Sequence, residues 1–352
     1  MFLKIKNTLE EELFAYLSLA NKSYSLNRLS PLLFKNIKEF ILRDGKRIRP
    51  ILFCIGYLGF SKKTPVGLYR CALSLELLHD FLLIHDDIID KSEQRRGKPA
   101  MHTLFNNYFG KNNKYKFTGE DLAIVVGDVI YALALDAFLA VEINFTRKEA
   151  ALKKLIRATL FTAGGEFIEL LLATKALAKI TQKDIYKIYD YKTANYTFAS
   201  PLTMGATLAG ANLKQINQLH SYGMLLGRAF QINDDIIGIF KTSKETGKSN
   251  LTDLQEAKRT LLVWYAFKHA NKEDKISINK IMRNKITRDS DLIKMRRIII
   301  ATGALTYAQK QINYLHAKAL RQISGLKMQK EYTQALINFS KKILTIDNLS
   351  NL

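Results

Sequence analysis

Carboxylates recur at helical spacing in the segment SLELLHDFLLIHDDIIDKSEQRRGKP. Asp86 and Asp90 are four residues apart, so a helix would place them on one face, with Asp87 beside them. Carboxylates that gather among apolar side chains repel one another unless cations neutralise them. Magnesium prefers oxygen ligands and commonly bridges one or two carboxylates to substrate phosphates. The segment therefore indicates a magnesium site, and a solvated acidic helix end is the alternative.

The same arrangement returns about 150 residues later, in the segment GRAFQINDDIIGIFKTSKETGKS. Gln231 lies three residues before Asp234 and four before Asp235, so one helix face presents an amide and two carboxylates. Two Asp-Asp pairs, each in an apolar helix and each followed by a basic loop, predict two walls of one cavity. Such a cavity would clamp a diphosphate through bridging metal ions.

Basic residues that are suited to bind a diphosphate accompany both segments. They are Arg95 and Arg96 after the first segment, Lys248 after the second, Lys46 and Arg49 at a predicted helix start, and Lys192 within an apolar helical stretch. The N–H groups at a helix start also favour anions, and a lysine in an apolar stretch needs an anionic partner or access to solvent. Solvated basic loops are the alternative for those that follow the carboxylates.

Helical spacing dominates the elements that must position these residues. Only five prolines occur, the last at Pro201, and strand-like alternation is scarcely visible. We expect an all-α fold of ten or more helices around one central cavity, with residues 1–352 as a single domain. The motifs occupy about residues 44–263, and a basic helical part follows over about 264–352.

The most apolar segment, Ala123–Ile143, is about the length of a membrane span but contains three acidic residues. An aspartate in the middle of a membrane costs about 2.5–3.5 kcal/mol, so we expect a buried core helix instead. Cys54 and Cys71 give neither a disulfide framework nor a metal-binding spacing. A reducing, cytoplasmic location is therefore expected.

The formal net charge is +22, and more than half of the excess lies in the last third of the chain. From Lys241 to the end there are 22 Lys and Arg residues against 9 Asp and Glu residues. No nucleic-acid-binding motif accompanies this charge, so no nucleic-acid partner is predicted. A solvated basic face that favours anionic substrates or makes a peripheral membrane contact is the preferred interpretation.

Several short motifs occur in the order and spacing found in the trans-isoprenyl diphosphate synthases. They are GKRIRP, DDIID followed by RRGKP, GD at Gly127, GGEFIEL, KTA at Lys192, and FQINDD with a later GK and KRT. Between about Asp44 and Val263 the chain resembles this family. The resemblance implies the type I isoprenoid synthase fold, a homodimer, and the condensation of isopentenyl diphosphate with an allylic diphosphate.

The resemblance also implies a role for each matching residue. Magnesium, as three ions in each active site, would be held by Asp86, Asp87, Asp90, Asp234 and Asp235. The allylic diphosphate would be held by Arg95, Lys192, Lys248 and, as a weaker candidate, Lys258; the isopentenyl diphosphate would be held by Lys46, Arg49, His79 and Arg96. Thr193 and Gln231 match positions that stabilise the allylic cation, and Lys192 is grouped with them as catalytic.

Product length in this family depends on bulk just before the first aspartate motif. Phe81 lies five residues before Asp86, about 7.5 Å along the helix, although helical rotation alone would aim Leu82 more directly at the cavity. An aromatic residue at this position resembles the type that makes geranylgeranyl diphosphate. The alternatives are a farnesyl or longer product, ordinary core packing for Phe81, and a catalytically silent partner subunit.

Overall fold

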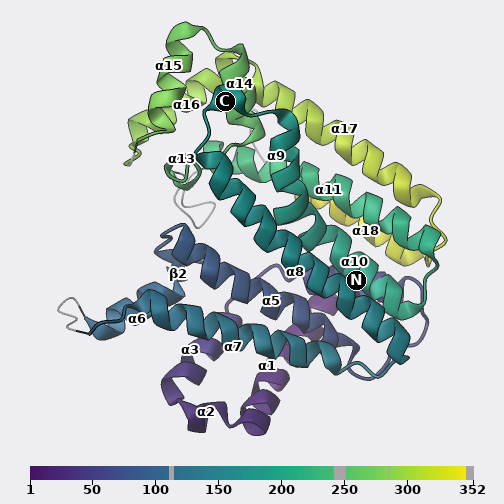
Figure 1. Ribbon diagram of the computed structural model, residues 1–352. Coiled ribbons are helices and arrows are strands. Elements are labelled where there is room, and N and C mark those ends of the chain that lie inside the picture. Colours follow the sequence, from purple (N-terminus) through teal and green to yellow (C-terminus); the bar gives the residue numbers. More distant parts are fainter. Residues whose placement is uncertain (111–114, 242–250, 285, 346–352) are drawn as a thin grey trace. The chain divides into compact units, whose positions relative to one another are not determined.

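The computed structural model describes residues 1–110, 115–241, 251–284 and 286–345, and most of them are helical (Figure 1). The described residues form more than ten helices and one two-stranded hairpin, so the all-α prediction is confirmed. The chain divides into two compact units: Met1–Lys153 with Met204–Gly210, and Lys154–Thr203 with Ala211–Leu352. The prediction of a single domain stays a prediction.

Unit 1 contains the first predicted motifs. Its elements are α1 (Phe2–Tyr24), α2 (Leu26–Leu29), α3 (Pro31–Ile41), α4 (Ile48–Leu58), α5 (Leu68–Ile89), β1 (Gln94–Arg95), β2 (Lys98–Pro99), α6 (Met101–Phe109) and α7 (Gly119–Leu139). The helix α5 is buried along most of its length and packs against α7, α4 and α1. This packing fixes the position of α5, the helix that leads to the first aspartate motif.

One helix in the described part of the chain, α7, is long and apolar enough to cross a membrane, and 44% of its most apolar window is buried. In unit 1 it packs against α5 and α6. Asp136 within it accepts hydrogen bonds from the Tyr16 and Tyr24 hydroxyls, at 2.8 and 2.6 Å. These contacts agree with the prediction of a core helix.

Unit 2 contains the second aspartate motif. Two helices, α8 (Phe145–Ala173) and α10 (Ser200–Ala209), cross the division between the units. The other elements of unit 2 are η1 (Leu177–Lys179), α9 (Gln182–Ile188), η2 (Tyr189–Ala199), α11 (Leu213–Phe240), α13 (Thr252–Gln255), α14 (Leu261–His269), α15 (Lys272–Ile281), α16 (Asp289–Ala301), α17 (Ala304–Ser324) and α18 (Lys330–Leu344).

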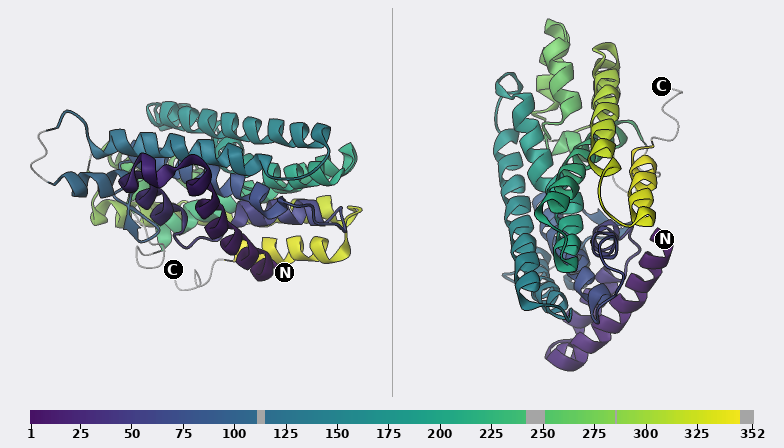
Figure 2. Two further views of the ribbon diagram at one scale, coloured as in Figure 1. Left: turned by 90° about the horizontal axis from the view of Figure 1, so that it is seen from below. Right: turned by 90° about the vertical axis from the view of Figure 1, so that its right-hand side faces the viewer.

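The helix α11 is the central element of unit 2. It packs against η2, and α17 and α18, at the yellow end of the colour scale, also pack along it (Figure 2). Gly223 and Gly227 on α11 permit the close approach of η2. A Cβ at Gly223 would lie 2.5 Å from the Cα of Ala199, and a Cβ at Gly227 would lie 2.4 Å from the Cα of Ala194. The resulting contact places the second aspartate motif beside η2.

Candidate active site

The three aspartates of the first motif lie at the C-terminal end of α5 but differ in environment. Asp86 and Asp90 are partly exposed, whereas the Asp87 side chain is fully buried. Arg95, on β1, donates from Nε to an Asp87 carboxylate oxygen at 2.8 Å and contacts Asp86 at 3.4 Å. Burial of this guanidinium favours its neutral form, but the Asp87 and Asp86 carboxylates raise the pKa of Arg95 above its usual value. Asp87 and Arg95 therefore form a buried ion pair, while Asp86 and Asp90 face outward.

The predicted basic loop RRGK is a tight β-hairpin. Arg95 pairs with Lys98 across the two strands, and the two turn residues, Arg96 and Gly97, have φ of 55° and 71°. Positive φ at both central residues is the requirement of a type I′ turn, which matches the twist of the flanking strands. Arg43 on the segment after α3 donates to the Arg95 carbonyl oxygen at 3.2 Å. The hairpin directs the Arg95 and Arg96 side chains to different carboxylates.

Arg96 lies beside two buried carboxylates of α5. Its Nη2 is 3.3 Å from Glu76 and 3.3 Å from Asp80. Burial, and after it the charge of Glu76, raises the pKa of Asp80 to about 8. Neither carboxylate can be recognised from the sequence, because a polar residue in a helix is usually solvated.

The segment GKRIRP alternates in exposure. Lys46 is exposed and Arg49 is partly exposed, whereas Arg47 between them is buried and adopts a left-handed backbone conformation with φ of 49°. The Arg47 guanidinium donates to Glu10 at 2.9 Å and to Glu76 at 2.7 Å. It thereby ties α1 and α5 to the start of α4. The positioning role of Arg47 is not visible in the sequence, since a run of cations does not reveal which member turns inward.

The remaining predicted residues of unit 1 lie on α5. His79 is partly exposed and Phe81 is partly exposed. The Phe81 ring lies 4.6 Å from the His85 ring and 5.1 Å from the Tyr131 ring of α7, between centroids. Gly127 on α7 leaves room for His85, because a Cβ there would lie 2.6 Å from the imidazole Nε2. Phe81 therefore packs toward α7.

The second aspartate motif, on α11, repeats the division between outward and inward carboxylates. Asp234 is exposed and Asp235 is buried. The Tyr189 hydroxyl donates to Asp235 and accepts from the Leu261 backbone N–H at 2.9 Å. Burial, and after it the Asp235 charge, raises the pKa of Tyr189 well above its usual value, so the phenol remains a donor.

A chain of hydrogen bonds links Asp235 to the predicted catalytic residues. The Gln231 amide donates to Asp235 at 3.0 Å, and its oxygen accepts from the Thr193 hydroxyl at 2.6 Å. Thr193 and Lys192 lie in η2, an 11-residue π-helix. Such helices are rare and often occur at functional sites, because the wider turn re-aims side chains. The structure thus brings Thr193, Gln231 and Asp235 together.

Lys192 is held between two glutamates of α8. Its Nζ lies 2.5 Å from Glu166 and 2.6 Å from Glu169, so the anionic partners that this lysine needs come from the GGEFIEL motif. Gly165 permits the close approach of α8 and η2, since a Cβ there would lie 2.8 Å from the Lys192 backbone nitrogen. In unit 2, Lys258 pairs with Glu256 at 2.6 Å. Lys248 lies outside the described residues.

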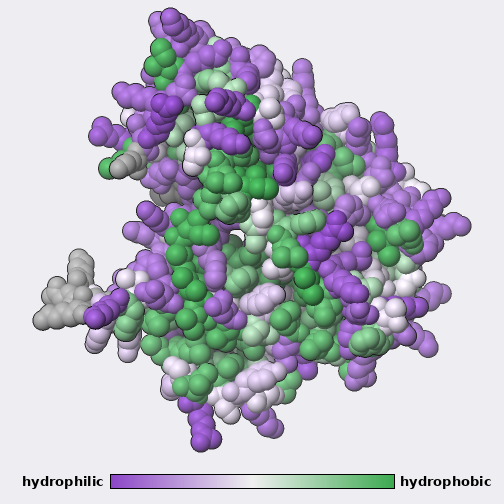
Figure 3. Space-filling model, in the orientation of Figure 1, coloured by the Kyte–Doolittle hydropathy of each residue, from purple (hydrophilic) through white to green (hydrophobic). Residues whose placement is uncertain are grey.

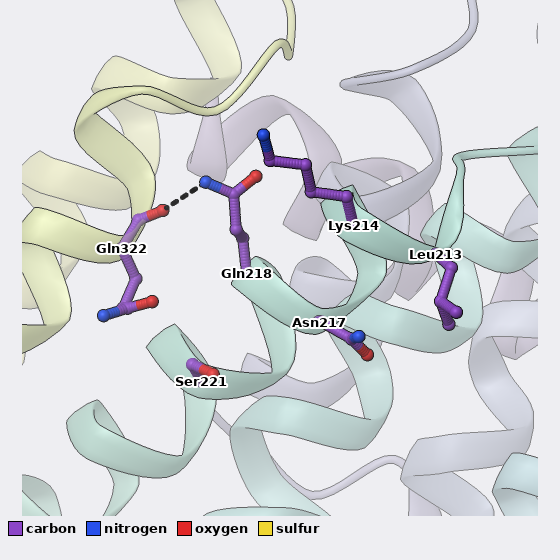
Figure 4. A pocket seen from close by; sticks show the side chains of 6 residues that line it. All are labelled: Leu213, Lys214, Asn217, Gln218, Ser221 and Gln322. Atoms are coloured by element: carbon purple, nitrogen blue, oxygen red, sulfur yellow. Dashed lines mark hydrogen bonds between the residues drawn. The ribbon is translucent and has the colours of Figure 1, made fainter.

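A groove of about 420 Å³ in unit 2 contains none of the predicted site residues. It is lined by Leu213, Lys214, Asn217, Gln218, Ser221 and Gln322 (Figure 4). Gln218 donates across it to the Gln322 carbonyl oxygen at 3.5 Å. The lining offers no carboxylate to a metal ion, so the groove is unsuited to the metal-bridged diphosphate chemistry that the two aspartate motifs predict.

Comparison with known proteins identifies the family. Residues 30–299 match the model of the polyprenyl synthetase family. The chain belongs to this family. It is a trans-isoprenyl diphosphate synthase, an enzyme that condenses isopentenyl diphosphate with an allylic diphosphate.

Archaeal enzymes and a bacterial crystal structure are among its relatives. The chain is 30% identical to geranylgeranyl diphosphate synthase of Saccharolobus solfataricus over 82% of this chain and 85% of that protein. It is 30% identical to geranylfarnesyl diphosphate synthase of Aeropyrum pernix over 85% of this chain and 89% of that protein. The structure superposes on geranylgeranyl pyrophosphate synthase of Corynebacterium glutamicum, which was crystallised with isoprenyl diphosphate and magnesium. The TM-score is 0.89 over 97% of this chain and 98% of that chain, at 26% identity. The predicted family and type I isoprenoid fold are confirmed; the role of each site residue stays a prediction.

Proposed function

We propose that this synthase makes geranylgeranyl diphosphate, and that its site residues act as the family motifs predict. The ring of Phe81, packed between His85 on its own helix and Tyr131 on α7, is the observation that carries the product assignment. A bulky aromatic side chain held by two other rings makes a firm floor for a growing hydrocarbon. Similarity to geranylgeranyl diphosphate synthases supports the same product.

The carboxylates fit magnesium. Asp86, Asp90 and Asp234 offer partly or fully exposed oxygen ligands, and oxygen is the donor that Mg²⁺ prefers. Asp87 and Asp235, buried against Arg95 and Tyr189, would hold those outward carboxylates in place or bind an ion through water. When bound, three magnesium ions would neutralise the charge that develops on the departing diphosphate.

The basic residues form two groups, and each group is proposed to bind one substrate. Lys192, with Arg95, Lys248 and Lys258, would bind the allylic diphosphate; Lys46, Arg49, His79 and Arg96 would bind the isopentenyl diphosphate. Lys192 is held by Glu166 and Glu169, which fixes its position before substrate arrives. A preorganised cation binds an anionic substrate without further side-chain ordering.

The hydrogen-bonded pair Thr193 and Gln231 would face the allylic cation with oxygen dipoles. Because Gln231 donates to Asp235, its carbonyl oxygen carries additional negative charge toward Thr193. The apolar helices around the pair would keep water from the cation. The released diphosphate is the proposed acceptor of the proton that the product loses.

A cytoplasmic homodimer is the proposed assembly. Along α8 the exposed side chains of Ile156, Leu160, Phe167, Leu170 and Leu171 form one apolar stripe at helical spacing (Figure 3). A stripe of this length is what a second copy of the chain would cover. Analytical ultracentrifugation of the wild type and of Leu160→Glu tests this: a wild-type monomer would contradict it.

A product assay tests the chemistry and the floor. Purified protein, magnesium and labelled isopentenyl diphosphate are incubated with dimethylallyl, geranyl or farnesyl diphosphate. We expect geranylgeranyl diphosphate from the wild type, no product from Asp86→Ala, and longer products from Phe81→Ala. Leu82→Ala is the matched control and should leave the product length unchanged.

Other outcomes separate the remaining alternatives. Lengthening by Leu82→Ala but not Phe81→Ala would move the floor to Leu82. A farnesyl or longer product from the wild type would discard the chain-length assignment. No condensation with any primer would indicate a catalytically silent partner subunit.

A further inference from the structure

The segment of residues 271–301, which comprises α15, α16 and the residues between them, concentrates positive charge that the catalytic proposal does not use. Residues 271–301 contain nine basic and four acidic residues, a net charge of +5. Lys272, Lys280, Arg283, Lys294 and Arg297 are all exposed. None of them is a predicted substrate or metal ligand. The excess charge therefore needs another explanation.

Four exposed isoleucines accompany these cations. Ile276, Ile286, Ile293 and Ile300 are 61%, 75%, 65% and 45% exposed. The opposite faces of the helices already supply the core, through the buried side chains of Ile278, Ile281, Leu292, Met295, Ile298 and Ile299. Folding of unit 2 thus leaves the four outward isoleucines without a packing role.

The apolar and basic side chains alternate along each helix face. On α15, Lys272, Ile276 and Lys280 are spaced four residues apart and so share one face. On α16, Ile293, Arg297 and Ile300 share a face in the same way. Long basic side chains can lay their aliphatic stems on apolar surface while the charges reach outward. A mixed face of this kind can set its basic groups among lipid headgroups while its isoleucines reach the boundary with the acyl chains.

The two helices lie side by side (Figure 1). A groove between them is lined by Asp274 and Ser277 of α15 and by Ile293 and Lys294 of α16. Arg297 bridges the pair through an ion pair with Asp274 at 2.7 Å. Figure 3 shows hydrophobic side chains set among hydrophilic ones over these helices. The pair presents a mixed surface rather than a purely charged one.

We propose that this α15–α16 surface docks the enzyme on an anionic lipid membrane. The phosphate groups of anionic lipids complement its positive charge, and the isoleucines enter the boundary between headgroups and acyl chains. A nucleic acid is the less suitable partner, because residues 271–301 contain no aromatic side chain on which a base could stack. Docking would place the enzyme at the phase that accepts the long apolar tail of its prenyl diphosphate product, whatever the product length.

Vesicle sedimentation of the purified full-length protein tests the proposal. Vesicles of phosphatidylcholine alone are compared with vesicles that also contain phosphatidylglycerol, at low and high salt. We expect binding to the anionic vesicles that weakens with salt, because surface charges are screened. Lys272→Gln with Lys280→Gln should lower the partition coefficient about fivefold for each charge removed. Ile276→Gln with Ile293→Gln should also lower it while the dependence on salt remains.

The matched control replaces two exposed lysines elsewhere in unit 2, Lys327→Gln with Lys330→Gln. Both follow the C-terminal end of α17, whereas α16 precedes its N-terminal end. This control should leave binding within about twofold of the wild type. All variants should keep the wild-type melting temperature and prenyltransferase activity. Equal sedimentation with neutral and anionic vesicles would overturn the proposal, as would an equal loss in the control. Binding to RNA in place of vesicles would reassign the surface.

Discussion

The two adjacent aspartates Asp86 and Asp87 should differ sharply in what their substitution does. The Asp87 side chain is fully buried against Arg95, whose side chain is 6% exposed, whereas Asp86 is 24% exposed and lies farther from that guanidinium. Removing one partner of a buried ion pair costs about 3–5 kcal/mol when the other charge is left uncompensated. Because Asp86 at 3.4 Å still offsets part of the Arg95 charge, Asp87→Asn should lower the free energy of unfolding by up to this amount, with a fall in Tm of up to about 10 °C.

Asp86→Asn serves as the matched comparison. A partly exposed ion pair contributes less than about 1 kcal/mol, so this variant should unfold close to the wild type. It should instead lose the stabilisation that magnesium with inorganic diphosphate confers on the wild type. Chemical unfolding followed by circular dichroism, with chelator and then with both ligands, measures the two effects. Equal loss of stability in the two variants without ligand would refute the distinction between a positioning and a ligand carboxylate.

Two further predictions concern Asp80 and Gly165. Burial and Glu76 raise the pKa of Asp80 from 3.8 to about 8, so the folded state binds a proton that the unfolded state releases; stability should be full below about pH 4 and fall as the pH rises toward 8. The melting temperature should therefore fall less with rising pH for Asp80→Asn than for the wild type. Parallel curves for the two proteins would contradict the raised pKa of Asp80. Gly165→Ala should destabilise the protein by about 1–3 kcal/mol and reduce turnover of the allylic substrate, because its methyl group would displace Lys192. Gly164→Ala is the control, because its methyl group would meet no atom of another element within 4 Å among the described residues; it should be neutral or stabilising by about 0.5–1 kcal/mol. If Gly164→Ala and Gly165→Ala lost equal stability, the loss would not come from the contact with Lys192.

The sequence by itself determined the helical class and the chemistry. Asp86 and Asp90 share a face because helical periodicity requires it, whatever surrounds the helix. The order and spacing of the motifs along the chain are enough to indicate the family. Local rules suffice for such features, since they depend on spacing along one element.

Only the tertiary structure decided which member of each motif turns inward. Asp87, Asp235 and Arg47 have neighbours of the same type in sequence, and their burial depends on Arg95, Tyr189 and Glu76. Those partners come from other elements or other turns of the chain. The burial of a charge is favourable only where such a partner meets it, and no spacing rule contains that information.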